Sequence, residues 1–182
     1  MPAGRYAPSP SGDLHLGNLR TAVVAWLLAR HARSRFVVRI EDLDPACRSN
    51  RWVDQQIADL AALGLEWDGE IVKQSGRFDL YHDALDTLTR AGRTFECYCT
   101  RREVQDATRA AHDAAHAPAY PGTCRDLSLA ERRRRTDEGR PAALRLRGAP
   151  DEVTFVDTIA GPFSGPADDL VIRRNDGTPA YN

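Results

Sequence analysis

Residues 5–18 of the chain read Arg5-Tyr6-Ala7-Pro8-Ser9-Pro10-Ser11-Gly12-Asp13-Leu14-His15-Leu16-Gly17-Asn18. The stretch opens with a short segment bounded by turn residues, and its prolines, serines and Gly12 are typical of a loop. Beyond it, side chains that can line one helix face recur at three- and four-residue steps: Leu19, Ala22, Val23, Trp26, Leu27 and Arg30. This spacing predicts an amphipathic helix that begins between His15 and Asn18. The order is therefore strand, loop and helix.

A second β-rich segment follows the helix and reads Phe36-Val37-Val38-Arg39-Ile40-Glu41. It ends at Asp42-Leu43-Asp44-Pro45, where the proline favours an extended conformation of the preceding residue. Two strands joined by a helix form a β-α-β unit, which predicts an α/β fold with a parallel sheet. Ligands of such sheets bind at the carboxyl ends of the strands. We therefore expect a site near residues 5–9 and Glu41.

Further elements are indicated by caps and stops along the chain. Helices are expected over residues 50–63 and 75–91, because Gly64 and Gly92 stand where helices commonly end. Two capping boxes, Thr100 with Glu103 and Ser128 with Glu131, each start another helix. Strands are expected over residues 143–147 and 169–174.

Composition indicates a soluble globular protein, with 42% hydrophobic and 28% charged residues among 182. No apolar run has the length of a membrane span, and the first residues lack the apolar core of a signal peptide, so we expect a cytoplasmic protein. A net charge of −1 means that any contact with nucleic acid depends on a local patch. The arginines at 132–135 are one such run, although a solvated helix face is the simpler interpretation.

The stretch that ends in His15-Leu16-Gly17-Asn18 resembles the first signature of class I aminoacyl-tRNA synthetases in its glutamyl form. The resemblance implies a Rossmann-like catalytic domain that binds ATP, accompanied by Mg²⁺, through His15, Gly17 and Asn18. Attack on the α-phosphate gathers negative charge, which a helix N-terminus and an imidazole can stabilise. Asn18 stands where the family commonly has histidine, and its amide can still donate. The simpler alternative is that His15 only caps the helix and Gly17 only eases packing.

A pocket for glutamate needs a guanidinium for a carboxylate and an acid for the ammonium group, and Arg5 and Glu41 fit these roles. Taken singly, each could be a solvated surface residue. The resemblance implies a glutamate site formed by Arg5, Tyr6, Ala7, Pro8, Ser9, Glu41 and Tyr181.

Cys97-x-Cys99 is followed after twenty residues by Tyr120-x3-Cys124. Two ligand pairs on separate loops are typical of a structural zinc site. The spacing alone leaves His112 or His116 as further candidates, whereas the resemblance implies Cys97, Cys99, Tyr120 and Cys124. We expect one structural zinc, with Cys47 outside the site. The chain then divides into residues 1–95, the first half of the catalytic domain, 96–140, a zinc-binding insertion, and 141–182, a return towards the catalytic sheet.

Three details favour the glutamyl-Q branch of the family: Asp42-Leu43-Asp44-Pro45, Tyr120-Pro121-Gly122-Thr123-Cys124, and Ala180 before Tyr181-Asn182. Membership of that branch implies a monomeric enzyme that activates L-glutamate with ATP and transfers it to the queuosine base of tRNA(Asp). A discriminating glutamyl-tRNA synthetase fragment and a non-catalytic zinc-containing module that binds RNA or protein are the alternatives.

The second class I signature, a lysine-rich loop of the Lys-Met-Ser-Lys-Ser type, does not occur in these residues. Lys73 is the only lysine and lies in no such pattern. We therefore expect a C-terminally truncated chain with an incomplete catalytic sheet, whose own activity is an open question.

Overall fold

The computed structural model describes residues 3–110, 120–148 and 152–180 and divides into two compact units, Met1–Leu80 and Tyr81–Asn182. The first unit contains β1 (Ala3–Tyr6), α1 (Leu16–His31), β2 (Arg35–Ile40), the 3-10 helix η1 (Pro45–Cys47), α2 (Asn50–Ala62), β3 (Val72–Lys73) and the 3-10 helix η2 (Gln74–Arg77). Helix α3 (Phe78–Arg90) continues from the first unit into the second. A search of the described residues finds no helix with the length and apolar character needed to cross a membrane.

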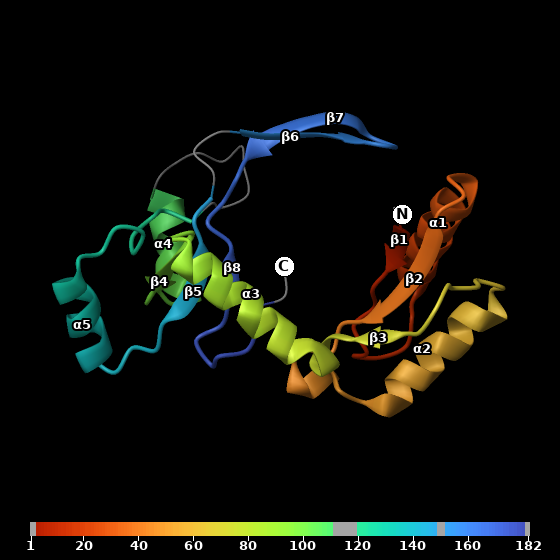
Figure 1. Cartoon of the computed structure of the whole chain (residues 1–182), viewed down its shortest axis with the longest axis horizontal. Helices are drawn as coiled ribbons and strands as arrows, with labels where there is room; N and C mark the ends of the chain where they lie inside the picture. The colour runs from red at the N-terminus through yellow and green to blue at the C-terminus, as the bar shows by residue number, and fades with distance from the viewer. Residues whose placement is uncertain (1–2, 111–119, 149–151, 181–182) are drawn as a thin grey trace. The chain divides into compact units, whose positions relative to one another are not determined.

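The three strands of the first unit form a parallel sheet in the order β1-β2-β3 (Figure 1). Residues 3–6 pair in register with residues 35–38, and residues 39–40 pair with residues 72–73. The connection from β1 to β2 runs through α1, which packs on both strands. The predicted α/β fold with a parallel sheet is therefore confirmed.

Helix α1 lies close to the sheet because small residues face each other at the contact. A Cβ atom on Gly4 would lie 2.8 Å from the Cβ of Ala29, which is closer than two such carbons can approach. On β2, Phe36, Val38 and Ile40 alternate into the same core. Leu27, which the spacing placed on the packed face, is exposed.

The second unit contains β4 (Thr94–Cys97), α4 (Arg101–Ala110), α5 (Leu129–Asp137), β5 (Ala143–Leu146), β6 (Glu152–Asp157), β7 (Gly161–Pro166) and β8 (Val171–Arg173). Strands β4, β5 and β8 form an antiparallel sheet, and β6 and β7 form a separate hairpin. The sequence predicted β5 and β8 but not β4 or the hairpin. Strands β4 and β5 are neighbours in this sheet. The chain between Cys97 and Ala143 therefore connects two adjacent strands.

The predicted helix boundaries are confirmed where local signals were strong. The Thr100 and Glu103 box closes at the start of α4, with Thr100 N–H to Glu103 Oε2 at 2.7 Å and Glu103 N–H to Thr100 Oγ1 at 3.2 Å. Ser128 and Glu131 cap α5 in the same way. Gly64 and Gly92 follow α2 and α3 with φ of 72° and 67°, the left-handed conformation that glycine adopts without strain. The three-part division of the chain at residues 95 and 140 stays a prediction.

Candidate active site and metal site

His15 is the N-cap of α1. Its Nδ1 accepts hydrogen bonds from the backbone N–H groups of Gly17 at 3.1 Å and Asn18 at 3.3 Å, and Asn18 Oδ1 accepts the His15 N–H at 3.1 Å. An Nδ1 that accepts carries no hydrogen, so the neutral ring holds its proton on Nε2. The cap therefore fixes the tautomer and makes Nε2–H the donor of the ring. Capping and donation to a ligand are compatible roles for this residue.

Gly17 leaves room for the imidazole that caps the helix. A Cβ atom at this position would lie 3.0 Å from His15 Cε1 and 3.1 Å from His15 Nδ1. The contact with the imidazole is thus sufficient to explain why position 17 is a glycine. The close approach of a nucleotide to this glycine stays a prediction. Asn18 directs its carbonyl oxygen at the His15 N–H, so its amide nitrogen is the group that can donate elsewhere.

The loop between β1 and α1 is held by hydrogen bonds from two directions. Pro8 O accepts the N–H of Glu41 at 2.9 Å, which continues the contact between the first two strands. Gln56 of α2 donates from Nε2 to Ser9 O at 3.1 Å and to Gly12 O at 2.7 Å. Sequence reasoning missed Gln56, since a glutamine within a helix carries no pattern that distinguishes it from a surface residue.

Arg5 lies on β1, and Glu41 is the first residue after the neighbouring strand β2. Arg5 pairs in register with Val37, and strand alternation places Val37 and Arg39 on one side of β2. Arg5 is exposed on this face, opposite the face that Gly4 presents to α1. Glu41 is buried and bonded to Arg39, with Nη2 to Oε1 at 2.5 Å. Arg39 is thus a partner of the site that sequence reasoning did not assign.

The other residues assigned to glutamate differ in burial. Tyr6 packs in the core with Phe36 and Val38, and burial raises the pKa of its hydroxyl above the usual range. Pro8 is buried, Ala7 is half-buried and Ser9 is exposed. Tyr181 lies outside the described residues.

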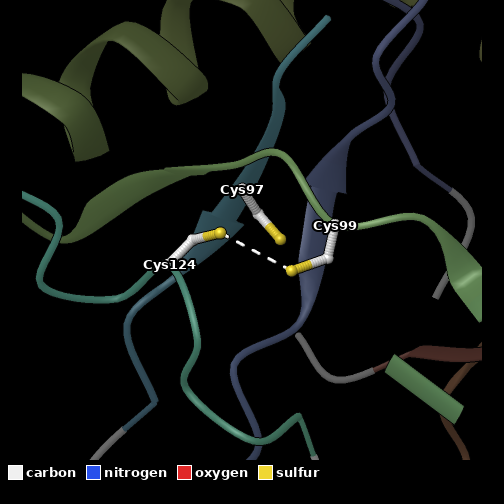
Figure 2. Close-up of side chains that lie close together, drawn as sticks. All are labelled: Cys97, Cys99 and Cys124. Atoms are coloured by element: carbon white, nitrogen blue, oxygen red, sulfur yellow. Dashed lines mark hydrogen bonds between the residues drawn. The ribbon is translucent and has the colours of Figure 1, made fainter. Parts of the chain in front are cut away.

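Three thiols converge in the second unit (Figure 2). Cys97 is the last residue of β4, Cys99 follows two residues later, and Cys124 lies in a loop before α5. Their sulfur atoms all lie within 4.8 Å of one another, and Cys99 Sγ to Cys124 Sγ is 3.5 Å. Tyr120 Oη lies 3.3 Å from Cys97 Sγ and 3.8 Å from Cys99 Sγ. The structure therefore brings together the four predicted ligands, while His112 and His116 lie outside the described residues.

The spacing of these four atoms fits a tetrahedral metal ion. Zinc–sulfur bonds of about 2.3 Å and zinc–oxygen bonds of about 2.0 Å place two sulfurs about 3.8 Å apart, and a sulfur and an oxygen about 3.5 Å apart. The observed separations lie close to these values: 3.5 Å between the sulfurs of Cys99 and Cys124, and 3.3 and 3.8 Å from Tyr120 Oη to the sulfurs of Cys97 and Cys99. Cys47 lies in η1 of the first unit and is not one of the clustered thiols.

Burial disfavours charge on most of the cluster. It is the main cause that raises the pKa of Cys99 to about 12, and the neighbouring Cys97 adds to it. Burial likewise raises the pKa of Tyr120 above the usual range. Burial alone would also raise the pKa of Cys124, but hydrogen bonds from the Tyr98 backbone and the Tyr120 hydroxyl outweigh it and lower that pKa. A cation bound here would therefore have to displace the proton of the Cys99 thiol, whose pKa burial raises.

The loop that carries Tyr120 and Cys124 is fixed to the antiparallel sheet. Tyr120 donates its backbone N–H to Asp168 Oδ1 at 2.9 Å, and the guanidinium of Arg145 lies 3.8 Å from the centre of its ring. Arg125 pairs with the buried Asp169 at 2.5 Å. The position of the Tyr120–Cys124 loop is thus set by contacts with the second unit's own side chains as well as by the cluster.

Comparison with known proteins gives a consistent result. Residues 3–182 match the family tRNA synthetases class I (E and Q), catalytic domain. The chain is 57% identical over 180 residues to a glutamyl-Q tRNA(Asp) synthetase of Nocardia farcinica, covering 99% of this chain and 57% of that protein. It is 43% identical over 183 residues to a glutamate–tRNA ligase of Oleidesulfovibrio alaskensis, covering 98% and 38%.

A solved structure of a glutamate tRNA ligase from Elizabethkingia meningosepticum, in complex with its amino acid, superimposes with a TM-score of 0.77 at 28% identity, covering 98% of this chain and 39% of that one. The chain spans about half the length of the curated glutamyl-Q relatives it matches, from 51% to 60%. The matches in sequence and in structure thus each cover nearly the whole chain. The chain belongs to the family of catalytic domains of class I tRNA synthetases for glutamate and glutamine.

Proposed function

We propose that the protein activates L-glutamate with ATP and transfers the glutamyl group to the queuosine base of tRNA(Asp). The observation that carries this proposal is the capped start of α1 after the loop that follows a parallel strand, where the positive end of the helix dipole lies beside an imidazole whose Nε2–H can donate. Relatives at 46% to 57% identity are named glutamyl-Q tRNA(Asp) synthetases, which supports the choice of acceptor.

ATP, with its Mg²⁺, binds at the loop and the first turn of α1. The α-phosphate gains negative charge as glutamate attacks it, and this charge is stabilised by donors that are already in place. His15 supplies Nε2–H, because its Nδ1 is occupied by the cap. Gly17 and Asn18 complete the helix start. The helix dipole adds a positive end at the same point.

Glutamate binds at the carboxyl ends of β1 and β2, where Arg5 and Glu41 lie. The Arg5 guanidinium is exposed there and pairs with a carboxylate of the substrate. Glu41 accepts the ammonium group, while Arg39 holds Oε1 and so fixes the orientation of the carboxylate. The backbone of residues 6–9 and Tyr181 complete the pocket.

The cluster of Cys97, Cys99, Tyr120 and Cys124 binds one zinc ion in a structural role. All four tetrahedral positions are taken by protein atoms, so the ion offers no position for a substrate. These residues connect the end of β4 to the loop before α5. Residues 96–140 are then a zinc-binding insertion that helps to position RNA, between residues 1–95 and the return of residues 141–182. The protein acts as a monomer in the cytoplasm.

Two measurements test this function. The first is glutamate-dependent ATP–pyrophosphate exchange without tRNA, which the proposal requires. The second compares transfer of labelled glutamate to tRNA(Asp) with queuosine, to tRNA(Asp) without it, and to tRNA(Glu). Charging of tRNA(Glu) alone would assign the chain to the glutamate–tRNA ligases, which several relatives at 40% to 43% identity represent. A full-length form that shows neither exchange nor transfer would support a non-catalytic binding module.

A further inference from the structure

Gln56 is a buried amide on the face of α2 that packs into the core. Its side chain is 1% exposed, and it lies between Val53 and Leu60, which are both buried on the same helix. Helical spacing of three and four residues places these positions on one apolar stripe. Packing alone would favour a leucine or an isoleucine at the central position, because an amide must be desolvated there.

The amide makes two hydrogen bonds to a distant part of the chain. Nε2 donates to Ser9 O at 3.1 Å and to Gly12 O at 2.7 Å, so one NH₂ group joins both ends of a four-residue loop. The orientation follows from these partners, since a flipped amide would direct its oxygen at two carbonyl oxygens. Oε1 is buried and has no hydrogen-bond partner among the described residues. Because desolvation of an amide is unfavourable, the two hydrogen bonds from Nε2 account for an amide rather than an apolar side chain at this position.

Gly12 has no side chain that could fix its own position, and a Cβ atom there would meet no atom within 4 Å, whereas Pro10 is fully buried and Leu14 packs against the core. The hydrogen bond from Gln56 to Gly12 O therefore restrains a point only three residues before His15. Movement of Gly12 would shift the helix start and the cap that orients the imidazole.

We propose that Gln56 is a positioning residue, which holds the Ser9–Gly12 loop so that the His15-capped start of α1 meets the phosphates of ATP. The inference rests on the proposed function for the identity of the nucleotide. Helix α2 contributes no residue to the signature at residues 5–18. Through Gln56, it would nevertheless affect the affinity for ATP. Glutamate affinity is expected to depend less on Gln56 than ATP affinity does, because Arg5 and Glu41 are held by the strands and only Ser9 of the glutamate pocket is bonded to Gln56.

The test compares Gln56→Met with two variants of the same helix. Methionine has a similar length and volume but donates no hydrogen bond. Gln55→Met is the matched control, since Gln55 is exposed and bonds only to Asp59 along α2 among the contacts of the described residues. Leu60→Ala removes a buried side chain without touching the loop and reports the effect of lost stability alone.

The readouts are the dissociation constant for ATP, the KM values for ATP and glutamate, the melting temperature and amide hydrogen exchange of residues 9–18. Gln56→Met should raise the dissociation constant and the KM for ATP roughly tenfold, as expected for loss of about one net hydrogen bond, while the KM for glutamate changes less. Its loop amides should exchange faster. Gln55→Met should leave all values unchanged, and Leu60→Ala should lower the melting temperature without a selective effect on ATP.

An unchanged dissociation constant and unchanged loop exchange in Gln56→Met would overturn the proposal, as would an equal loss of ATP affinity in Leu60→Ala. A wild-type protein that binds no ATP would instead overturn the proposed function, and the exchange of the loop amides would still decide whether Gln56 holds the loop. Gln56→Asn, whose amide is one methylene too short to reach both carbonyls, replaces the methionine variant if that protein does not fold. The same loss of ATP affinity is expected from it.

Discussion

Substitution of His15 separates its two roles, the helix cap and the donor to ATP. His15→Ala removes both, because alanine accepts no hydrogen bond from Gly17 or Asn18 and offers no Nε2–H. His15→Asn removes only the donor, since asparagine is among the preferred N-cap residues. Ser128→Ala is the matched control: it removes the equivalent cap of α5, where Ser128 Oγ accepts the Glu131 N–H at 3.3 Å.

The two roles differ in size. The cap satisfies two backbone N–H groups that are exposed at the helix start, so water replaces the imidazole and the loss of unfolding free energy should be about 1 kcal/mol. Loss of one preorganised donor to the transition state lowers activation about 10²-fold, equivalent to about 2.7 kcal/mol. His15→Ala should therefore show both effects. His15→Asn should show only the second, and Ser128→Ala only the first.

The measurements are urea unfolding for the cap and glutamate-dependent ATP–pyrophosphate exchange for the donor, both on the longest form of the protein that can be expressed. Exchange by His15→Asn at the wild-type rate would refute the catalytic role and leave His15 as a cap alone. A loss of exchange in Ser128→Ala equal to that in His15→Ala would show that stability, not donation, limits the rate.

Metal binding, acid stability and helix packing give the remaining predictions. Purified protein should contain one zinc per chain, which Cys124→Ser releases and Cys47→Ser retains in elemental analysis; a metal-free wild type after zinc-supplemented refolding would contradict the site. Arg140 Nη2 lies 2.5 Å from Glu103 Oε1, and its hydrogen bond is the main cause that lowers the pKa of Glu103 from 4.5 to about 2. The contribution of this ion pair to stability is therefore present above pH 4.5 and lost as the pH falls towards 2. Glu103→Gln should thus flatten the dependence of the urea midpoint on pH between these values, and an unaltered slope would count against the ion pair. Gly4→Val should lower stability by about 1–3 kcal/mol by pushing α1 from β1, whereas Gly76→Ala, with open space around it, should change it little.

Local signals in the sequence were sufficient for much of the fold. The capping boxes at Thr100 and Ser128 depend on residues three apart, so they form wherever the chain permits a helix, and both were confirmed. The β-α-β unit was likewise predicted, because its strands and helix alternate over a short stretch. The close approach of α1 at Gly4 was not predicted, since it depends on Ala29 across the helix-to-strand contact.

The β6–β7 hairpin was missed for a physical reason. Both strands are exposed along nearly their whole length, so burial imposes no alternation on their residues. Strand β7 reads Gly-Pro-Phe-Ser-Gly-Pro, a composition more typical of a turn. Its pairing is visible only in the structure, where Phe155 and Phe163 face each other with ring centres 5.1 Å apart.

The candidate site shows a similar division. The four metal-cluster residues were predicted from their spacing and the family resemblance, and the structure brings them together. Gln56 and Arg39 were not predicted. Each acts through a contact with another residue of the site. The partner of Gln56 is 44 residues away in the sequence, and the pairing of Arg39 with Glu41 depends on the side of the strand to which Arg39 belongs. The sequence alone indicates neither contact.

The contact between His15 and Gly17 restricts how these two positions can vary over evolution. A side chain at position 17 would have to displace the imidazole by a few tenths of an ångström, so the effect of adding one depends on which residue stands at position 15. The two positions are therefore expected to show epistasis: Gly17→Ala should be harmful beside histidine and nearly neutral beside a smaller capping residue. Lineages that have lost the histidine would then be free to lose the glycine as well, whereas lineages that keep the histidine should keep both.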